Sequence, residues 1–227
     1  MRTRGLVIFD SFNTLVTSGP GYEHTFLAGL GAVRPGASAD LLATLQAASE
    51  GLDHSEWSSS RRMYCQWANE SLAALARPSA GLDAELAPRV VPALEQLHQA
   101  PMVALPDAAD CLSMLRGAGF TIAVCSNWGW DLAADLAGTG LMAWIDVLVT
   151  SAQIGYRKPH PRIYQATLDR AGFSAADAVF VGDGLRTDAL GPKRAGIRSV
   201  LLARDAEEQI HPEQAASLGD VARLLLG

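Results

Sequence analysis

The sequence predicts an α/β protein whose parallel sheet is interrupted after its first strand by a block of helices. The apolar run Leu6–Phe9 has no polar alternation, which is typical of a strand buried on both faces. From residue 106 onward, similar short apolar runs alternate with helical patterns, as in sheets with right-handed helical crossovers. Between these parts, from about Val16 to Ala100, apolar residues recur at three- and four-residue spacing, which indicates helices.

The helical block is expected to form a domain of its own. Its clearest patterns cover residues 39–52, 55–77 and 83–100, separated by Pro35-Gly36, Pro78 and Gly81. We therefore expect a helical domain over residues 17–100, and an α/β domain made of residues 1–16 and 101–227. Tyr64 and Trp67 are three residues apart and share a helix face, so we expect them in the core of the helical domain.

The remaining elements follow in chain order. Asp107 can cap a helix, Pro161 suits the first turn of another, and Gly172 and Gly196 mark helix ends. The predicted strands are residues 121–125, 146–150, 178–181 and 199–202. The predicted helices are residues 107–116, one beginning near 130, and residues 161–171, 188–195 and 218–226.

Composition narrows the class of protein. The chain has 227 residues, 49% of them hydrophobic, and a formal net charge of −6. These values are those of a globular protein, and the acidic balance argues against nucleic acid or an anionic membrane as a partner. The first residues do not resemble a signal peptide, and no run reaches the ~20 apolar residues that a membrane span needs. The 3 cysteines match no disulfide framework, so we expect a cytoplasmic protein.

Polar, reactive residues follow four of the predicted strands. In open parallel sheets, ligands bind at the carboxyl ends of the strands, so these residues are expected to meet at one edge. They are Asp10, Ser126 with Asn127, Lys158, and Asp183 with Asp188.

In order and content these segments resemble the motifs of the haloacid dehalogenase (HAD) superfamily, over residues 5–15 and about 106–202. The resemblance implies a Rossmann-like parallel sheet core with an all-helical cap domain inserted after the first strand. It implies that Asp10 is the nucleophile, and that the hydroxyls of Thr14 and Ser126 hold the nucleophile or the transferring group. Lys158 would supply the cation that balances the crowded carboxylates.

The resemblance also implies a metal site in the phosphatase branch of the superfamily. Asp183 would coordinate Mg²⁺ and Asp188 would support the site. The chemistry agrees, because Mg²⁺ prefers oxygen ligands, and Asp10, Asp183 and the carbonyl of Phe12 could supply three of them. Two further acids would raise the pKa of a carboxylate nucleophile, whereas Lys158 and a divalent cation would lower it.

A small anionic substrate, most simply a phosphate ester, is expected at this edge. A helix begins close to Ser126 and Asn127, and the N–H groups at its start favour an anion. Lys158 adds positive charge. Trp128 and Trp130 follow directly, and these aromatic side chains could line the substrate pocket or could pack beneath the helical domain.

One residue departs from the phosphatase pattern. Most phosphatases of the superfamily carry a second aspartate two residues after the nucleophile, and it serves as general acid and base. Here that position is Phe12, an aromatic residue as in the superfamily's dehalogenases. Asp183 and Asp188, by contrast, match the metal-dependent phosphatases. The sequence favours a Mg²⁺-dependent phosphatase, and leaves open a metal-free 2-haloacid dehalogenase and a catalytically weakened binding protein.

Three other residues could join the site. Tyr164 and Arg34 lie roughly where the dehalogenases carry functional residues, and His160 could replace the missing acid. Each also has a simpler interpretation: an aromatic on a helix, a solvated arginine, and an exposed loop histidine. Asn13 stands where the superfamily usually has glycine, and asparagine tolerates a left-handed backbone better than most residues.

Overall fold

A parallel sheet forms the centre of the molecule. The computed structural model describes the chain except for residues 1–3, 21–24, 78–81, 98–99, 205 and 207. Six described strands pair in the order β5-β4-β1-β6-β7-β8, all parallel. Their bounds are Gly5–Phe9 (β1), Phe120–Ser126 (β4), Val147–Thr150 (β5), Ala178–Gly182 (β6), Arg198–Leu202 (β7) and Gln214–Ala215 (β8). The predicted α/β class is confirmed.

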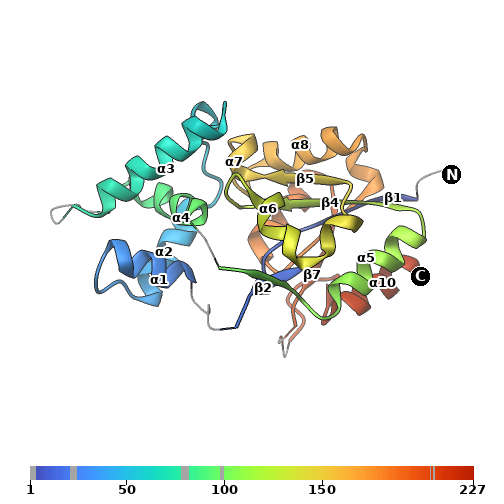
Figure 1. Ribbon diagram of the computed structural model, residues 1–227. Helices are drawn as coiled ribbons and strands as arrows, with labels where there is room; N and C mark the ends of the chain where they lie inside the picture. The colour runs from blue at the N-terminus through green and yellow to red at the C-terminus, as the bar shows by residue number, and fades with distance from the viewer. Residues whose placement is uncertain (1–3, 21–24, 78–81, 98–99, 205, 207) are drawn as a thin grey trace.

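Helices cover both faces of this sheet. Leu6 and Ile8 of β1 pack with α8 (Pro161–Ala171), whereas Val7 and Phe9 pack with α5 (Ala108–Gly117) and α10 (Leu218–Leu226). Figure 1 shows α8 on one side of the strands and α5 with α10 on the other. Because successive side chains of a strand point to opposite faces, burial on both faces requires the continuous apolar run seen in the sequence.

A group of four helices, here called the helical insert, lies between β2 and β3 in the chain. They are α1 (Thr25–Val33), α2 (Ala39–Ser49), α3 (Arg61–Leu75) and α4 (Ala87–Gln96). The insert supplies nearly all of a second hydrophobic core, which Ala152 of the sheet domain joins, and Tyr64 and Trp67 are fully buried in it, as predicted. Figure 1 places these helices together, beside one end of the sheet.

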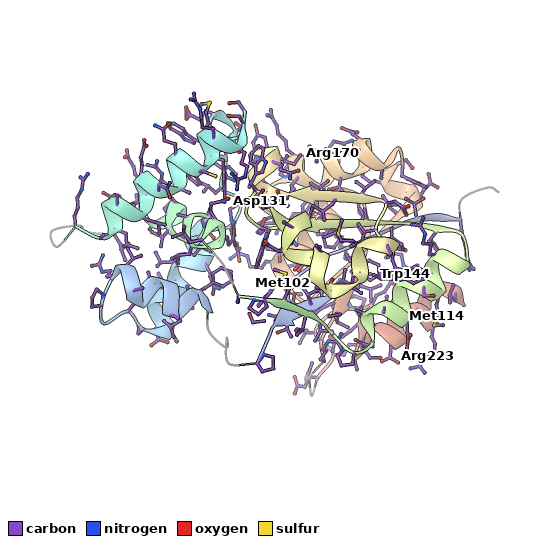
Figure 2. All side chains as sticks on the ribbon, in the orientation of Figure 1. Met102, Met114, Asp131, Trp144, Arg170 and Arg223 are labelled. Atoms are coloured by element: carbon purple, nitrogen blue, oxygen red, sulfur yellow. The ribbon has the colours of Figure 1, made fainter. Side chains whose placement is uncertain are left out.

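An antiparallel ribbon joins the insert to the sheet domain, and the sequence analysis did not expect it. β2 (Val16–Ser18) pairs with β3 (Met102–Ala104), with Val16 opposite Ala104 and Ser18 opposite Met102. Figure 2 labels Met102 on this ribbon. The helical pattern was expected to begin at about Val16, and this was wrong, because residues 16–18 form a strand by pairing with a segment far along the chain.

The helix expected at 188–195 is divided. Residues Leu185–Leu190 form one wide helical turn (η5), and a short helix, α9 (Gly191–Arg194), follows it. Pro192 has no N–H to donate, so a continuous helix through it would lose a hydrogen bond. The other short helices are η1 (Ser55–Trp57), α6 (Leu132–Leu136), η2 (Ala137–Thr139), η3 (Leu141–Trp144), α7 (Ser151–Ile154) and η4 (Ala175–Asp177). Among the described residues, the helices are all too short or too polar to cross a membrane.

Candidate active site

The predicted strand-end residues meet at one edge of the sheet. Asp10 directly follows β1, Ser126 is the last residue of β4, and Asp183 directly follows β6. Asp10, Asp183 and Asp188 each offer a carboxylate oxygen, and these three atoms lie within 4.8 Å of one another. The expected convergence of sequence-distant acids is therefore present.

Lys158 holds two of these acids. Its Nζ donates to Oδ1 of Asp10 at 2.8 Å and to Oδ1 of Asp188 at 2.6 Å, and its side chain is only 2% exposed. Burial by itself would lower the pKa of Lys158, but the neighbouring carboxylates outweigh this effect and raise it. The ammonium is therefore charged throughout the physiological pH range.

The carboxylates outnumber the cation. Burial raises the pKa of Asp183 to about 7 and of Asp188 to about 6, and repulsion between the acids adds to both shifts. Asp183 keeps solvent contact on one side, whereas Asp188 is buried. With all three acids ionised, the cluster with Lys158 carries −3 + 1 = −2. A divalent cation would neutralise it.

Two glycines let the chain wrap closely around Asp188. A Cβ on Gly182 would lie 2.6 Å from Cβ of Asp188, and a Cβ on Gly184 would lie 2.1 Å from Oγ1 of Thr187. The N–H of Gly184 donates to Oδ2 of Asp188 at 2.9 Å. Both carboxylate oxygens of Asp188 are thus engaged, one by Lys158 and the other by this loop.

The loop after Asp10 is a tight turn. The carbonyl of Ser11 accepts hydrogen bonds from the N–H groups of Thr14, Leu15 and Val16, and Asn13 has φ = 58°. This is a left-handed backbone, which asparagine tolerates better than most residues. The buried hydroxyl of Thr14 donates to Oδ1 of Asp183 at 3.4 Å. In this structure Thr14 therefore contacts an acid of the cluster rather than the nucleophile.

Asn127 positions the backbone of Lys158. Its Nδ2 donates to the carbonyl of Lys158 at 3.1 Å, and its Oδ1 accepts from the N–H of Lys158 at 2.7 Å. Ser126, just before it, is 2% exposed at the end of β4. Asn127 thus links the end of β4 to the loop of residues 155–160 that carries Lys158, here called the lysine loop. The sequence analysis placed both residues at the same edge of the sheet but did not predict this contact.

Phe12 belongs to an aromatic cluster at the boundary between core and insert. Its ring stacks on Trp128 with centroids 5.8 Å apart, and Phe26 of α1 meets both rings edge-on, at 6.4 Å and 6.0 Å. Trp128 is 2% exposed, and its Nε1 donates to Asp135 at 2.7 Å. These contacts favour packing for Trp128. Phe26 was missed, because an aromatic residue on an amphipathic helix gives no signal of a site.

Two of the secondary candidates, Tyr164 and His160, make contacts within the fold. Tyr164 is fully buried on α8, and its hydroxyl donates to the carbonyl of Thr187 at 2.5 Å. The Nδ1 of His160 accepts from the N–H of Arg162 at 3.3 Å and so caps the start of α8. Arg34 is half-buried just after α1.

A second buried ion pair beside Lys158 was also missed. Arg157 contacts Glu95 of α4 through two hydrogen bonds, Nη1 to Oε2 at 2.6 Å and Nη2 to Oε1 at 3.0 Å. Both side chains are about equally buried, at 5% and 6% exposure. No local pattern pairs two residues so far apart in sequence.

The cluster opens toward solvent on the Asp183 side. A cavity of about 300 Å³ is lined there by Asp183, Asn13, Thr17, Leu105, Leu202 and Arg204. Asp183 can therefore be reached from solvent.

The fold agrees with comparisons against known proteins. The chain matches the family model described as haloacid dehalogenase-like hydrolase over residues 5–196. The chain therefore belongs to the haloacid dehalogenase-like hydrolases.

Among curated proteins, the chain is 36% identical over 118 residues to human haloacid dehalogenase-like hydrolase domain-containing protein 3, covering 50% of this chain and 47% of that protein. It is 31% identical over 124 residues to phosphoserine phosphatase of Thermus thermophilus, covering 53% and 49%. Each alignment thus spans about half of the curated relative.

Two solved structures are similar over almost the whole chain. A HAD phosphatase from Thermococcus onnurineus superposes with a TM-score of 0.64 and 22% identity, covering 97% of each chain. A dehalogenase in an intermediate complex superposes with a TM-score of 0.62 and 26% identity, covering 99% of this chain and 98% of that one. The fold is thus shared by phosphatases and dehalogenases.

Proposed function

We propose that the chain is a Mg²⁺-dependent phosphatase that uses Asp10 as its nucleophile and acts on a small phosphorylated metabolite. The observation that carries this proposal is the cluster of Asp10, Asp183 and Asp188 beside one lysine, which carries a net charge of −2 when all three acids are ionised. A 2-haloacid would be repelled by such a cluster, whereas a divalent cation would be attracted. The similarity to a phosphoserine phosphatase supports the same class of substrate.

The residues present fit a magnesium ion. Carboxylates of Asp10 and Asp183 and the carbonyl of Phe12 are the hard oxygen ligands that Mg²⁺ prefers. Asp188 would support them from behind, because its oxygens are held by Lys158 and Gly184. When bound, the ion neutralises negative charge on the transferring phosphoryl group.

The chain's own groups then carry the reaction. Lys158 holds Oδ1 of Asp10, and we assign the attack to Oδ2. Oδ2 forms a bond to phosphorus while the bond from phosphorus to the leaving oxygen breaks, and that oxygen keeps the electron pair. A water molecule then attacks the aspartyl phosphate, releases inorganic phosphate and restores Asp10. Ser126, Asn127 and Lys158 are the proposed substrate-binding groups at this edge.

Phe12 limits the choice of substrate. A phenylalanine cannot protonate the leaving oxygen, and general acid catalysis is typically worth ~10²–10⁴-fold in rate. Substrates whose leaving group is stable as an anion, such as an aryl phosphate, depend least on that proton. We therefore expect the enzyme to favour them over alkyl phosphates.

The helical insert is proposed to act as a cap, which is consistent with the predicted division at residues 17–100. Phe26 of α1 contacts Phe12, and Glu95 of α4 contacts the residue before Lys158. An element in this place can exclude water from the strand ends.

The proposal is tested with a chromogenic aryl phosphate. We expect hydrolysis in the presence of Mg²⁺ and its loss on chelation with EDTA. Asp10→Asn should reduce kcat by about 10³-fold or more while the circular dichroism spectrum stays unchanged. Activity that survives either treatment would exclude the proposed mechanism.

A 2-haloacid dehalogenase is the second candidate. Phe12 and the similarity to a dehalogenase structure favour it. It predicts chloride release from 2-chloropropionate in the presence of EDTA. A catalytically weakened binding protein would instead be stabilised by inorganic phosphate and show neither activity.

A further inference from the structure

A buried ion pair connects the helical insert to the lysine loop of the site. Glu95 lies on α4 of the insert, and Arg157 immediately precedes Lys158. Their side chains meet fork to fork, with N–O distances of 2.6 Å and 3.0 Å. The buried Nε of Arg157 has no hydrogen-bond partner among the described residues. Its guanidinium is therefore held by the two hydrogen bonds to Glu95.

The backbone of the same loop is bound by the insert as well. The N–H of Gly51 donates to the carbonyl of Lys158 at 3.2 Å, and the N–H of Arg157 donates to the carbonyl of Leu52 at 3.0 Å. The N–H of His54 donates to the carbonyl of Gly155 at 2.7 Å. We call these three hydrogen bonds the lysine-loop ladder. The loop that carries Lys158 is thus held by the insert through both backbone and side chain.

The contact between the two parts is close at two glycines. A Cβ on Gly155 would lie 2.4 Å from Cα of Ser55, and a Cβ on Gly129 would lie 3.2 Å from the carbonyl oxygen of Glu95. Larger residues at these positions would push the insert away. The docked arrangement therefore depends on the backbone of the core as well as on the ion pair.

Stability alone does not account for this ion pair. Removing two charges from water costs several kcal/mol for each ion, and apolar residues of similar volume often replace such pairs without loss of stability. Burial raises the pKa of Glu95, which shows that the desolvation cost is present here, although Arg157 opposes the shift. What the pair does provide is one defined geometry between α4 and the lysine loop.

We propose that Glu95 is a positioning residue of the active site, acting from the insert through Arg157 on Lys158. With the insert docked, Glu95 holds the side chain of Arg157 in one position. Because Lys158 is the next residue in the chain, this also fixes its backbone, and its ammonium then lies between Asp10 and Asp188. Alignment of the lysine thereby depends on docking of the insert. The inference rests on the proposed function, because it concerns the lysine that holds the nucleophile.

Three variants test the proposal with the aryl phosphate assay. Glu95→Gln removes the charge and keeps the shape. Glu95→Gln/Arg157→Met removes both charges and leaves no buried ion unpaired. Asp131→Asn is the matched control, because it breaks another ion pair between insert and core, the exposed contact with Arg61. Figure 2 labels Asp131 on the side of the core that faces the insert.

We expect Glu95→Gln and the double variant to lower kcat by about 10²-fold, with KM changed less, because a small misplacement of a catalytic group has this effect. Asp131→Asn should stay within about twofold of wild type, as is usual for an exposed ion pair. If Glu95→Gln does not fold, the kcat of the double variant tests the proposal in its place. A double variant with wild-type melting temperature and wild-type kcat would overturn the proposal.

A second measurement does not need turnover. Hydrogen exchange of the amides of Gly51, His54 and Arg157 reports the lysine-loop ladder directly. Their exchange rates should rise by roughly tenfold or more in the double variant, and stay at the wild-type level in Asp131→Asn. Unchanged exchange in the double variant would overturn the inference. A wild type that is inactive toward phosphate esters, with increased exchange in the double variant, would instead reject only the proposed phosphatase function.

Discussion

Phe12 is the residue that most restricts the chemistry of this site. By its resemblance to the motifs of the superfamily, position 12 is where a phosphatase is expected to carry the acid that protonates the leaving group, and the ring of Phe12 packs there against Trp128 and Phe26. The same side chain thus removes an acid and helps to seat α1 on the core. A substitution here changes catalysis and packing together, so it needs a control of equal size.

The residue at position 12 can be tested by restoring the acid. Phe12→Asp should raise kcat/KM for an alkyl phosphate by about 10²-fold and raise it less for an aryl phosphate, because general acid catalysis helps poor leaving groups most. Phe12→Asn, which loses the same ring contacts without gaining a proton donor, should help neither substrate. Equal gains on both substrates would contradict the proton-donor argument.

His54 gives the insert a pH-dependent stability. It is 2% exposed and stacks on Trp67, with ring centroids 5.3 Å apart. Burial lowers its pKa from 6.5 to about 3, and the charge of Arg157 adds to the shift. The unfolded chain therefore binds a proton that the folded chain does not, as pH falls below about 6.5.

Wild type should consequently lose stability between pH 7.5 and pH 5, by about 2 kcal/mol more than His54→Gln, since each pH unit below the unfolded pKa is worth about 1.4 kcal/mol. The free energy of unfolding in urea at the two pH values measures this difference. An equal loss in both proteins would show that His54 is not held neutral.

Short connecting elements, more than the long helices, set the geometry of the site. The turn after β1 directs Thr14 to Asp183, the loop after β6 encloses Asp188, and the loop after α7 carries Lys158. The long helices α5, α8 and α10 cover the sheet and hold these loops at one edge. Precision at the site therefore depends on a few close backbone contacts.

The contact of α7 with the insert can be tested at its terminal glycine. Gly155 and Gly172 both end helices with positive φ, at 87° and 74°, but only a Cβ on Gly155 would collide with Ser55; for Gly172 nothing lies within 4 Å. Gly172→Ala should cost about 1 kcal/mol from backbone strain alone. Gly155→Ala should cost clearly more, measured as the free energy of unfolding. Equal costs would mean that the insert does not press on this turn.

For the molecule as a whole, the site concentrates negative charge in a protein that already carries −6. In the acid cluster Lys158 offsets one of the three carboxylate charges, and a divalent cation would offset the other two. Stability should therefore respond to divalent ions that bind this cluster, since a ligand that binds only the folded state stabilises it, and does so more as its concentration rises above the dissociation constant.

Addition of Mg²⁺ to about 100 times its dissociation constant should stabilise the protein by about 2.7 kcal/mol, seen as a higher melting temperature. Asp183→Asn should remove most of this effect, and NaCl at matched ionic strength should not reproduce it. A melting temperature that does not change when Mg²⁺ is added would favour the metal-free dehalogenase.

Particular residues show how much of the fold and of the candidate site could be predicted from the sequence. Leu6–Phe9 showed a doubly buried strand, and polar residues after four strands predicted the meeting of Asp10, Lys158, Asp183 and Asp188. Such inferences succeed because the pattern of burial along a strand, and the edge at which parallel strands end, are local properties.

Four contacts were decided only by the tertiary structure. They are the pairing of β2 with β3, the packing of Phe26 on Phe12, the hydrogen bonds of Asn127 to the backbone of Lys158, and the ion pair of Glu95 with Arg157. Each joins segments that are distant along the chain, and neither partner carries a local pattern that identifies the other. Their geometry arises when the insert docks against the sheet, so no reading of one segment at a time could supply it.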